Sequence, residues 1–383
     1  MKILRPPRIR SLPGEGERSA SWLELFFDLV FVVAVAQLAL ALADDPSAGG
    51  FARFALLFVP VWWAWVGYTN FSDRFGADDA GSRTLMLLGM LAVAGLAVAV
   101  PEAFAGASAA FALCYVANRL VLIAMNLRVW RHIPEAAPNV RALAGGFSVG
   151  TAIWLASLFV PEPGRYLLWL AAILIEGAVP WIFQRAVMTV PTHPSHLPER
   201  YGLFTIIVLG ESLVAVVIGL DHAEWNLAVG WVAAAGFATA AAMWWIYFDA
   251  LDSPRLKPTQ LARNTFIYAH LAIAMGLTLA GVGVKKAILS GEQIPAAGVW
   301  ALCGGVALTL VAISLISIVC MEGRRDLTLP ARLATAGAVV LIGAVGSELA
   351  PPLLMALLLA ALASLVGFEL VERESRAAET RTR

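Results

Sequence analysis

Charged side chains are scarce in this sequence. Only 14% of the 383 residues are Asp, Glu, Lys or Arg, and 60% are hydrophobic, whereas soluble domains average about 25% charged residues. Water alone would not solvate such a chain, which excludes an ordinary soluble protein. Lys and Arg together number 27, as do Asp and Glu. The chain therefore has no overall basic charge that would attract nucleic acid, and nucleic acid is not expected as a partner.

Cysteine is equally rare, and no catalytic motif is present. Cys114, Cys303 and Cys320 stand singly within apolar runs, so their spacing predicts neither a disulfide framework nor a zinc site. The sequence contains no nucleophile elbow, no phosphate-binding glycine loop and no zinc-protease helix. No serine or cysteine has an evident base beside it. We therefore expect no enzyme activity, no cofactor and no metal.

Long apolar runs, by contrast, recur along the whole chain. A helix needs about 20 apolar residues to cross the hydrocarbon layer, and it satisfies its own backbone polar groups. About twelve runs meet this requirement, which predicts an all-α, polytopic integral membrane protein. They lie near 22–43, 52–71, 84–100, 104–127, 143–160, 165–187, 201–220, 227–248, 264–284, 296–320, 332–348 and 352–371. The last two, split by prolines, could instead form one broken span.

Basic residues are distributed unevenly among the connections. Residues 1–21 carry five of them without an apolar core, which is typical of a basic leader and not of a cleavable signal peptide. With twelve spans, this leader, the even-numbered loops and the C-terminal tail hold 22 of the 27 Lys and Arg residues. Because cytoplasmic loops retain positive charge, we expect both termini in the cytoplasm.

Two stretches of the chain resemble each other. Trp62–Trp65 in the second span aligns with Trp244–Tyr247 in the eighth, and Asp73 or Asp249 follows near the cytoplasmic end. A six-plus-six duplication predicts parallel repeats with a pathway between them. The predicted organisation is a leader 1–21, a first membrane half 22–187, a connecting loop 188–200, a second half 201–371 and a charged tail 372–383. Chance is the alternative, because tryptophan favours membrane interfaces.

The first span carries two acids that require an explanation. A charge at mid-bilayer costs at least about 2.5 kcal/mol, so it needs a partner or a purpose. Glu24 and Asp28 are four residues apart on one helix face, and Gln37 lies nine residues further on. Two like charges one turn apart repel unless a cation or a proton accompanies them. Either the pair binds a cation or proton, or Glu24 reaches interfacial water while Asp28 pairs with an arginine.

Deep carboxylates outnumber the arginines that could neutralise them. Glu211 lies near the middle of the seventh span and Glu176 lies in the sixth, whereas Arg119 is the only basic residue at comparable depth. Arg119 cannot lose its proton, so we expect it to pair with Asp28, Glu176 or Glu211. Two of these acids then remain over, which favours a cation or proton pathway. Protonated structural acids are the alternative.

Histidines lie beside the seventh and ninth spans. The loop before the seventh span carries the motif His193, His196, Glu199 and Arg200. Two prolines in this loop disfavour a regular helix, and with it a helical metal-binding motif, so we interpret the motif as an interfacial cap and proton antenna. We interpret His270, at the start of the ninth span, as an interfacial histidine with its hydrogen bonds satisfied; alternatively, it could exchange protons with Asp249, which is near in sequence.

Two longer motifs carry a family resemblance. The run Glu24-Leu-Phe-Phe-Asp28-Leu-Val-Phe-Val resembles the opening signature of the bacterial low temperature requirement protein A family. The run from Glu199 to Ser212, with its preceding histidines, resembles the second signature. The likeness covers about residues 18–372. It implies a bacterial inner-membrane protein associated with growth in the cold, without defining a molecular activity.

These patterns together predict a cation- or proton-linked transporter or channel, with a pathway near Asp28, Arg119, Glu176 and Glu211. A non-transporting membrane scaffold or stress-adaptation factor is the main alternative. An intramembrane enzyme acting on lipid is disfavoured by the missing catalytic cluster. Membrane lipid and a small cation or proton are the expected partners, and a homo-oligomer is compatible with the sequence.

Overall fold

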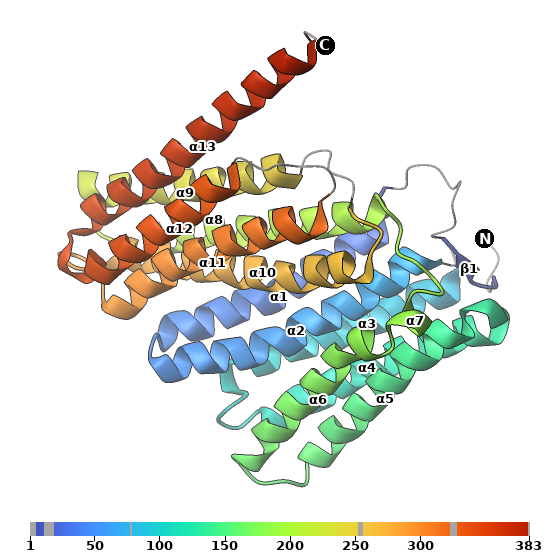
Figure 1. Ribbon diagram of the computed structural model, residues 1–383. Coiled ribbons are helices and arrows are strands. Elements are labelled where there is room, and N and C mark those ends of the chain that lie inside the picture. Colours follow the sequence, from blue (N-terminus) through green and yellow to red (C-terminus); the bar gives the residue numbers. More distant parts are fainter. Residues whose placement is uncertain (1–4, 11–18, 77–78, 252–255, 322–327, 382–383) are drawn as a thin grey trace. The chain divides into compact units, whose positions relative to one another are not determined.

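The computed structural model describes residues 5–10, 19–76, 79–251, 256–321 and 328–381, apart from the side chains of 376–381. Helices make up nearly all of this part of the chain (Figure 1). Within it, twelve helices are long and apolar enough to cross a membrane. The expected all-α membrane class is therefore confirmed. Much of the predicted leader 1–21, and the end of the tail 372–383, lie outside the described residues.

The long helices lie close to the predicted runs. They are α1 (Trp22–Asp44), α2 (Ala48–Arg74), α3 (Ala80–Ala99), α4 (Ser108–His132), α5 (Ala137–Ser157), α6 (Gly164–Ile182), α8 (His196–Asp221), α9 (Leu227–Leu251), α10 (Gln260–Leu289), α11 (Ala296–Cys320), α12 (Thr328–Val345) and α13 (Pro351–Arg381), with the short α7 (Gln184–Val187) after α6. The last two apolar runs form the separate helices α12 and α13, so a single broken span is excluded.

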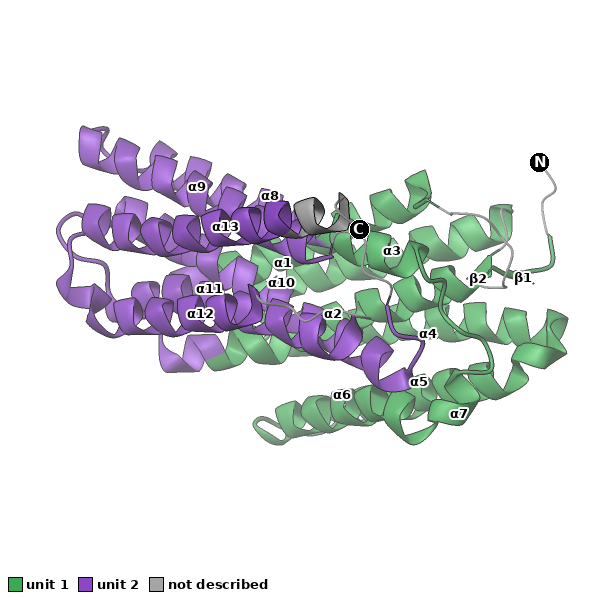
Figure 2. Cartoon of the chain, turned by 45° about the horizontal axis from the view of Figure 1, so that its top comes forward, with its two compact units in different colours: residues 1–41, 52–204 green, residues 42–51, 205–383 purple. Residues whose placement is uncertain are grey.

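The helices group into two compact units, coloured separately in Figure 2. The first unit comprises residues 1–41 and 52–204, and the second comprises 42–51 and 205–383. Within the first unit, α3, α4, α5 and α6 pack in chain order, each against the next. Within the second, α10, α11, α12 and α13 do the same, and α13 also packs against α9.

A short two-stranded sheet ties the N-terminal segment to the rest of the first unit. Strand β1 (Arg8–Ile9) pairs antiparallel with β2 (Phe75–Gly76), directly after α2. Asp79 then caps α3 by accepting the N–H of Ser82 at 3.1 Å, and it forms an ion pair with Arg128 at 2.5 Å. Burial alone would raise the pKa of Asp79, but the hydrogen bonds from Arg128, Arg5 and Ser82 hold it well below its usual range.

Glycines allow α10 and α11 to approach closely in the second unit. A Cβ added at Gly283 would lie 2.4 Å from the backbone nitrogen of Leu302, and one at Gly305 would lie 2.4 Å from the carbonyl oxygen of Gly276. Any larger residue at these positions would force the helices apart. Close backbone contact through small residues is the ordinary packing mode of membrane helices.

Candidate functional site

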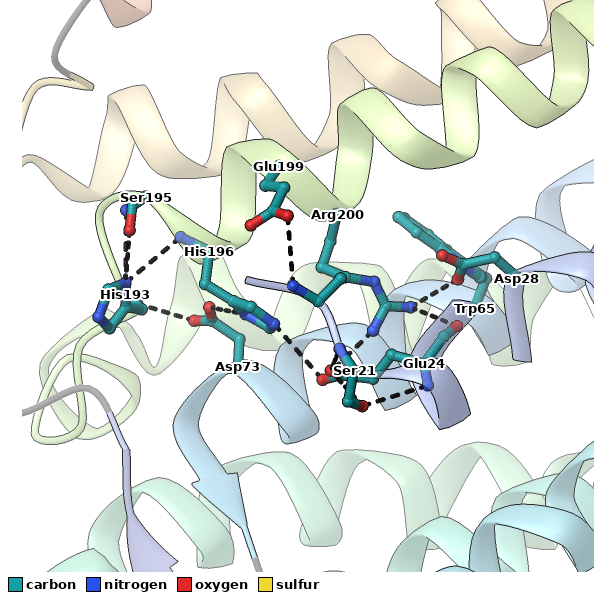
Figure 3. A network of polar contacts seen from close by, with 11 residues as sticks. Ser21, Glu24, Asp28, Trp65, Asp73, His193, Ser195, His196, Glu199 and Arg200 are labelled. Carbon is teal, nitrogen blue, oxygen red and sulfur yellow. Dashed lines mark hydrogen bonds and ion pairs between the residues drawn. The ribbon is translucent and has the colours of Figure 1, made fainter. Parts of the chain in front are cut away.

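A polar network lies inside the first unit, where the N-terminal ends of α1 and α8 meet the C-terminal end of α2 (Figure 3). Its members are Ser21, Glu24, Asp28, Trp65, Asp73, His193, His196 and Arg200. The exposed fraction of Glu24 is 3%, that of Arg200 is 1%, and those of Asp28, Asp73 and His196 are 0%. Buried charges at this density require mutual compensation, which the contacts below supply.

The start of α8 brings two of these residues onto one face. The helix begins at His196, earlier than the predicted start at residue 201, with Pro198 in its first turn. The expectation that the two prolines disfavour a regular helix is wrong for Pro198, because a proline in the first turn removes only an N–H that has no helical partner. His193 caps this turn, since its Nδ1 accepts the N–H of His196 at 3.3 Å. His196 and Arg200 are thereby one turn apart on α8.

His196 stands between two carboxylates. Its Nδ1 is 3.0 Å from Oδ1 of Asp73, and its Nε2 is 3.5 Å from Oε1 of Glu24. The first distance is that of a good hydrogen bond, whereas the second is an ion-pair distance that a small movement would shorten. Asp73 also accepts the backbone N–H of His193 at 2.9 Å. An imidazole with an acid at each nitrogen can receive a proton on one side and release it on the other.

Arg200 joins the two acids of α1. Its Nη2 is 2.5 Å from Oδ1 of Asp28, and its Nη1 is 3.3 Å from Oε1 of Glu24. The indole N–H of Trp65 donates to the same Asp28 oxygen at 2.7 Å. Glu24 and Asp28, the two like charges on α1, are therefore both paired with one cation. It is an arginine of another helix, and Glu24 is buried against it instead of lying free in interfacial water.

A cavity of about 700 Å³ adjoins the network within the first unit. Glu24 and Ser21 form part of its wall, together with Arg10 and Arg83. Ser21 donates to Glu24 from its hydroxyl at 2.7 Å and from its backbone N–H at 2.8 Å. Glu24 thus connects the buried network to a space large enough for several water molecules.

A second buried ion pair lies between α4 and α6. Arg119 is 2.7 Å from Glu176, and both side chains are fully buried. The Tyr115 hydroxyl bridges the two, because it accepts from Nε of Arg119 at 3.0 Å and donates to Glu176 at 3.0 Å. The guanidinium also lies over the ring of Phe147, 5.0 Å from its centroid. Of the three acids expected to compete for Arg119, the structure pairs Glu176 with it.

The expectation that two deep carboxylates lack an arginine partner needs correction. Arg200, which we expected in a loop, is a second buried arginine and is paired with Asp28. With Glu176 paired to Arg119, only one of the three deep acids remains over. That acid is Glu211 in the second unit, which has no hydrogen bond or ion pair with any described residue. Gln37 of α1 likewise forms no hydrogen bond within the described part of the chain.

Asp249 and His270 lie in the second unit, each with its own partner. His270 is fully buried well inside α10, not at the start of a span as expected, and its Nε2 is 2.9 Å from the Tyr247 hydroxyl. Its Nδ1 is 2.7 Å from the carbonyl oxygen of Phe266. Asp249 forms an ion pair with Arg373. The structure therefore provides no contact for the suggested proton exchange between them.

Three members of the network were not among the predicted site residues. The sequence does indicate a contact between Ser21 and Glu24, because a serine three residues before a glutamate has the spacing of a helix capping box. The sequence indicates Asp73 only as part of the possible repeat. Nothing in the sequence around Trp65 indicates that its indole reaches Asp28. Glu199 of the loop motif accepts the backbone N–H of Ala20 at 3.3 Å.

Comparison with known proteins agrees with the two sequence motifs. The family model described as bacterial low temperature requirement A protein (LtrA) matches residues 19–366, a range that contains every member of the network. A protein of Rhizobium meliloti (strain 1021), whose name describes it as uncharacterized, is 32% identical over 285 residues. The matched part is 70% of this chain and 69% of that protein. The chain therefore belongs to the bacterial low temperature requirement A family.

Proposed function

We propose that this chain is a proton-linked transporter or channel of the membrane, in which His196 passes protons between Asp73 and Glu24. The supporting observation is a fully buried imidazole with a carboxylate at each nitrogen, 3.0 and 3.5 Å away. Only the imidazolium form can donate to both acids at once. Gain or loss of one proton therefore changes both contacts, which tie α8 to α2 and to α1.

The charge balance of the network supports this role. Glu24, Asp28 and Asp73 supply three negative charges, and Arg200 supplies one positive charge. Arg74 adds a second beside Asp73, although its own hydrogen bonds go to the carbonyl oxygens of Asn70 and Val190. With all three carboxylates ionised, the buried group is neutral when His196 carries a proton. Loss of that proton leaves a net negative charge in a buried site, which gives protonation a direct influence on the packing of these helices.

The hydrogen-bond donors favour a proton over a metal cation. Asp28 accepts from Trp65 and Arg200, and Glu24 accepts from Ser21. Hard metal ions bind carboxylates through oxygen lone pairs, and both donors of Asp28 go to its Oδ1, so only Oδ2 of that carboxylate remains open to a metal. A proton, in contrast, does not have to displace these donors, because it can lie between two groups that are already hydrogen-bonded. Glu24, on the wall of the 700 Å³ cavity, is then the group that exchanges protons with water.

The predicted duplication and orientation belong to the same proposal. The same order of packing in α3–α6 and in α10–α13 supports two six-helix repeats. The basic residues of the leader, even-numbered loops and tail support cytoplasmic termini in a bacterial inner membrane. A C-terminal fusion tests the orientation. A fluorescent protein there should fold and fluoresce, and alkaline phosphatase should be inactive; the opposite pair of results would reverse the topology.

Proton flux into proteoliposomes tests the function. The native protein should acidify vesicles under an imposed gradient, and His196→Gln should lower the rate at least about tenfold, because an amide cannot exchange a proton. His222→Gln is the matched control, since His222 is exposed, directly follows α8, and its Nδ1 contacts only the carbonyl oxygen of Ile218 in the last turn of that helix. If folded native protein moves no protons above empty vesicles, the network is a structural brace and the scaffold alternative is correct.

A further inference from the structure

A second cavity of about 700 Å³ is a groove between α5 and α6, which pack side by side in the first unit (Figure 1). Its lining includes the exposed hydrophobic residues Val149, Leu174, Ile175, Ile182 and Phe183. The exposed fractions are as high as 62% for Leu174 and 69% for Ile182. Both helices belong to candidate membrane spans, so hydrocarbon is the environment expected for this surface.

The floor of the groove is formed by small residues. Ala142, Gly145 and Gly146 of α5 lie opposite Ala178 and Val179 of α6. A Cβ added at Gly145 would meet no atom within 4 Å, whereas one at Gly146 would lie 2.3 Å from Val179. Gly146 therefore serves the contact between the helices, and Gly145 leaves open space.

One end of the groove is basic. Arg141 is the only charged residue in the lining, and its guanidinium lies over the Trp130 ring, 5.2 Å from the centroid. Arg185, in α7, is exposed just beyond the end of α6. From Arg141 to Val149 the groove extends about 12 Å along α5, at 1.5 Å per residue. A basic side chain at the interface above an apolar slot complements a lipid in both charge and polarity.

We propose that this groove binds an anionic phospholipid of the surrounding bilayer, with one acyl chain between α5 and α6 and its phosphate at Arg141. The apolar walls accept an acyl chain of any phospholipid. Preference for a net negative headgroup comes from the arginine, because a zwitterionic headgroup carries its own positive charge and gains less from a second one.

Native mass spectrometry of the purified protein in nanodiscs of phosphatidylglycerol and phosphatidylcholine tests the proposal. The native protein should retain phosphatidylglycerol preferentially. Gly145→Leu should lower retention of both lipids about tenfold, since a Cβ at this position meets no atom within 4 Å and the larger side chain occupies the open space. Gly337→Leu in α12 is the matched control, because a Cβ at Gly337 also meets nothing within 4 Å.

Arg141→Gln separates the two parts of the site. Its side chain is exposed, so the variant should fold normally, keep the bound lipid and lose the preference for phosphatidylglycerol. Equal retention by Gly145→Leu and Gly337→Leu would overturn the acyl-chain groove. An unchanged preference in Arg141→Gln would overturn the headgroup assignment. Neither readout depends on proton flux, so failure of this site and failure of the proposed transport are distinguishable.

Discussion

Nδ1 of His196 lies 3.0 Å from Oδ1 of Asp73, although the two residues are 123 positions apart in the sequence. This contact joins the end of α2 to the start of α8, and both side chains are completely buried. Asp73 is additionally fixed by the backbone N–H of His193, so its orientation does not depend on the imidazole. Asp73 therefore remains a hydrogen-bond acceptor in the same position whether His196 is protonated or neutral.

A double-mutant cycle measures how strongly this pair is coupled. Asp73→Asn and His196→Gln should each lower the free energy of unfolding by about 1.5–3 kcal/mol, the range for hydrogen bonds to charged groups. The double variant should lose clearly less than the sum, because each single change already removes the shared contact. Thermal unfolding in detergent at pH 7 provides the values. Strictly additive losses would show that the two side chains act independently.

Removing Arg200 should be among the most damaging single changes in the first unit. Arg200→Gln leaves Glu24 and Asp28 buried one turn apart without their cation, and breaking such a pair costs about 3–5 kcal/mol. Arg185→Gln is the control, since Arg185 is exposed and should tolerate the change. Adding Asp28→Asn to Arg200→Gln should recover part of the lost unfolding free energy. A loss in Arg200→Gln no larger than that in Arg185→Gln contradicts the ion-pair account.

The length of the apolar runs was sufficient to predict the membrane helices, because crossing the hydrocarbon layer sets a strict requirement on each segment. The sequence also predicted, as one of two alternatives, that Asp28 pairs with an arginine. The identity of that arginine was not, because it lies 172 residues away and helical periodicity indicates a face of a helix but not which helix opposes it. Arg200 and His196 fall in the predicted loop because the apolar run begins at residue 201 and because Pro194 and Pro198 disfavour a helix before it.

The buried Glu176 requires a glycine opposite it. A Cβ at Gly150 would lie 2.2 Å from Oε1 of Glu176, so Gly150→Ala should displace the carboxylate from Arg119 and destabilise the protein by about 1–3 kcal/mol. Gly145→Ala in the same helix meets no atom within 4 Å and should be neutral or slightly stabilising, because alanine is the better helix former. Thermal unfolding of the two variants in parallel decides the matter. An equal change in unfolding midpoint in the two variants would mean that α5 and α6 can shift to accommodate the added methyl group without loss of stability.

Asp79 should give the first unit a stability that depends on acid pH. Its folded-state pKa is held low, chiefly by the Arg128 hydrogen bond acting against the effect of burial, so its contribution is complete above the unfolded-state pKa of about 3.9. It is lost as pH falls toward the lower folded-state pKa. Asp79→Asn keeps a helix cap but loses the ion pair. The difference in unfolding midpoint between the native protein and this variant should shrink below about pH 4; a constant difference would exclude the ion pair as its source.

The Arg119–Glu176 pair should be structural, in contrast to the network around His196. Both side chains are fully buried, the Tyr115 hydroxyl bridges them, and neither lines the cavity beside Glu24. Glu176→Gln should therefore lower the unfolding midpoint while the proton flux per folded molecule changes by less than about twofold. Glu24→Gln, at the water-facing end of the network, should abolish most of the flux. If Glu176→Gln instead abolishes flux and leaves stability intact, the proton route runs through α4 and α6, and His196 is not its central residue.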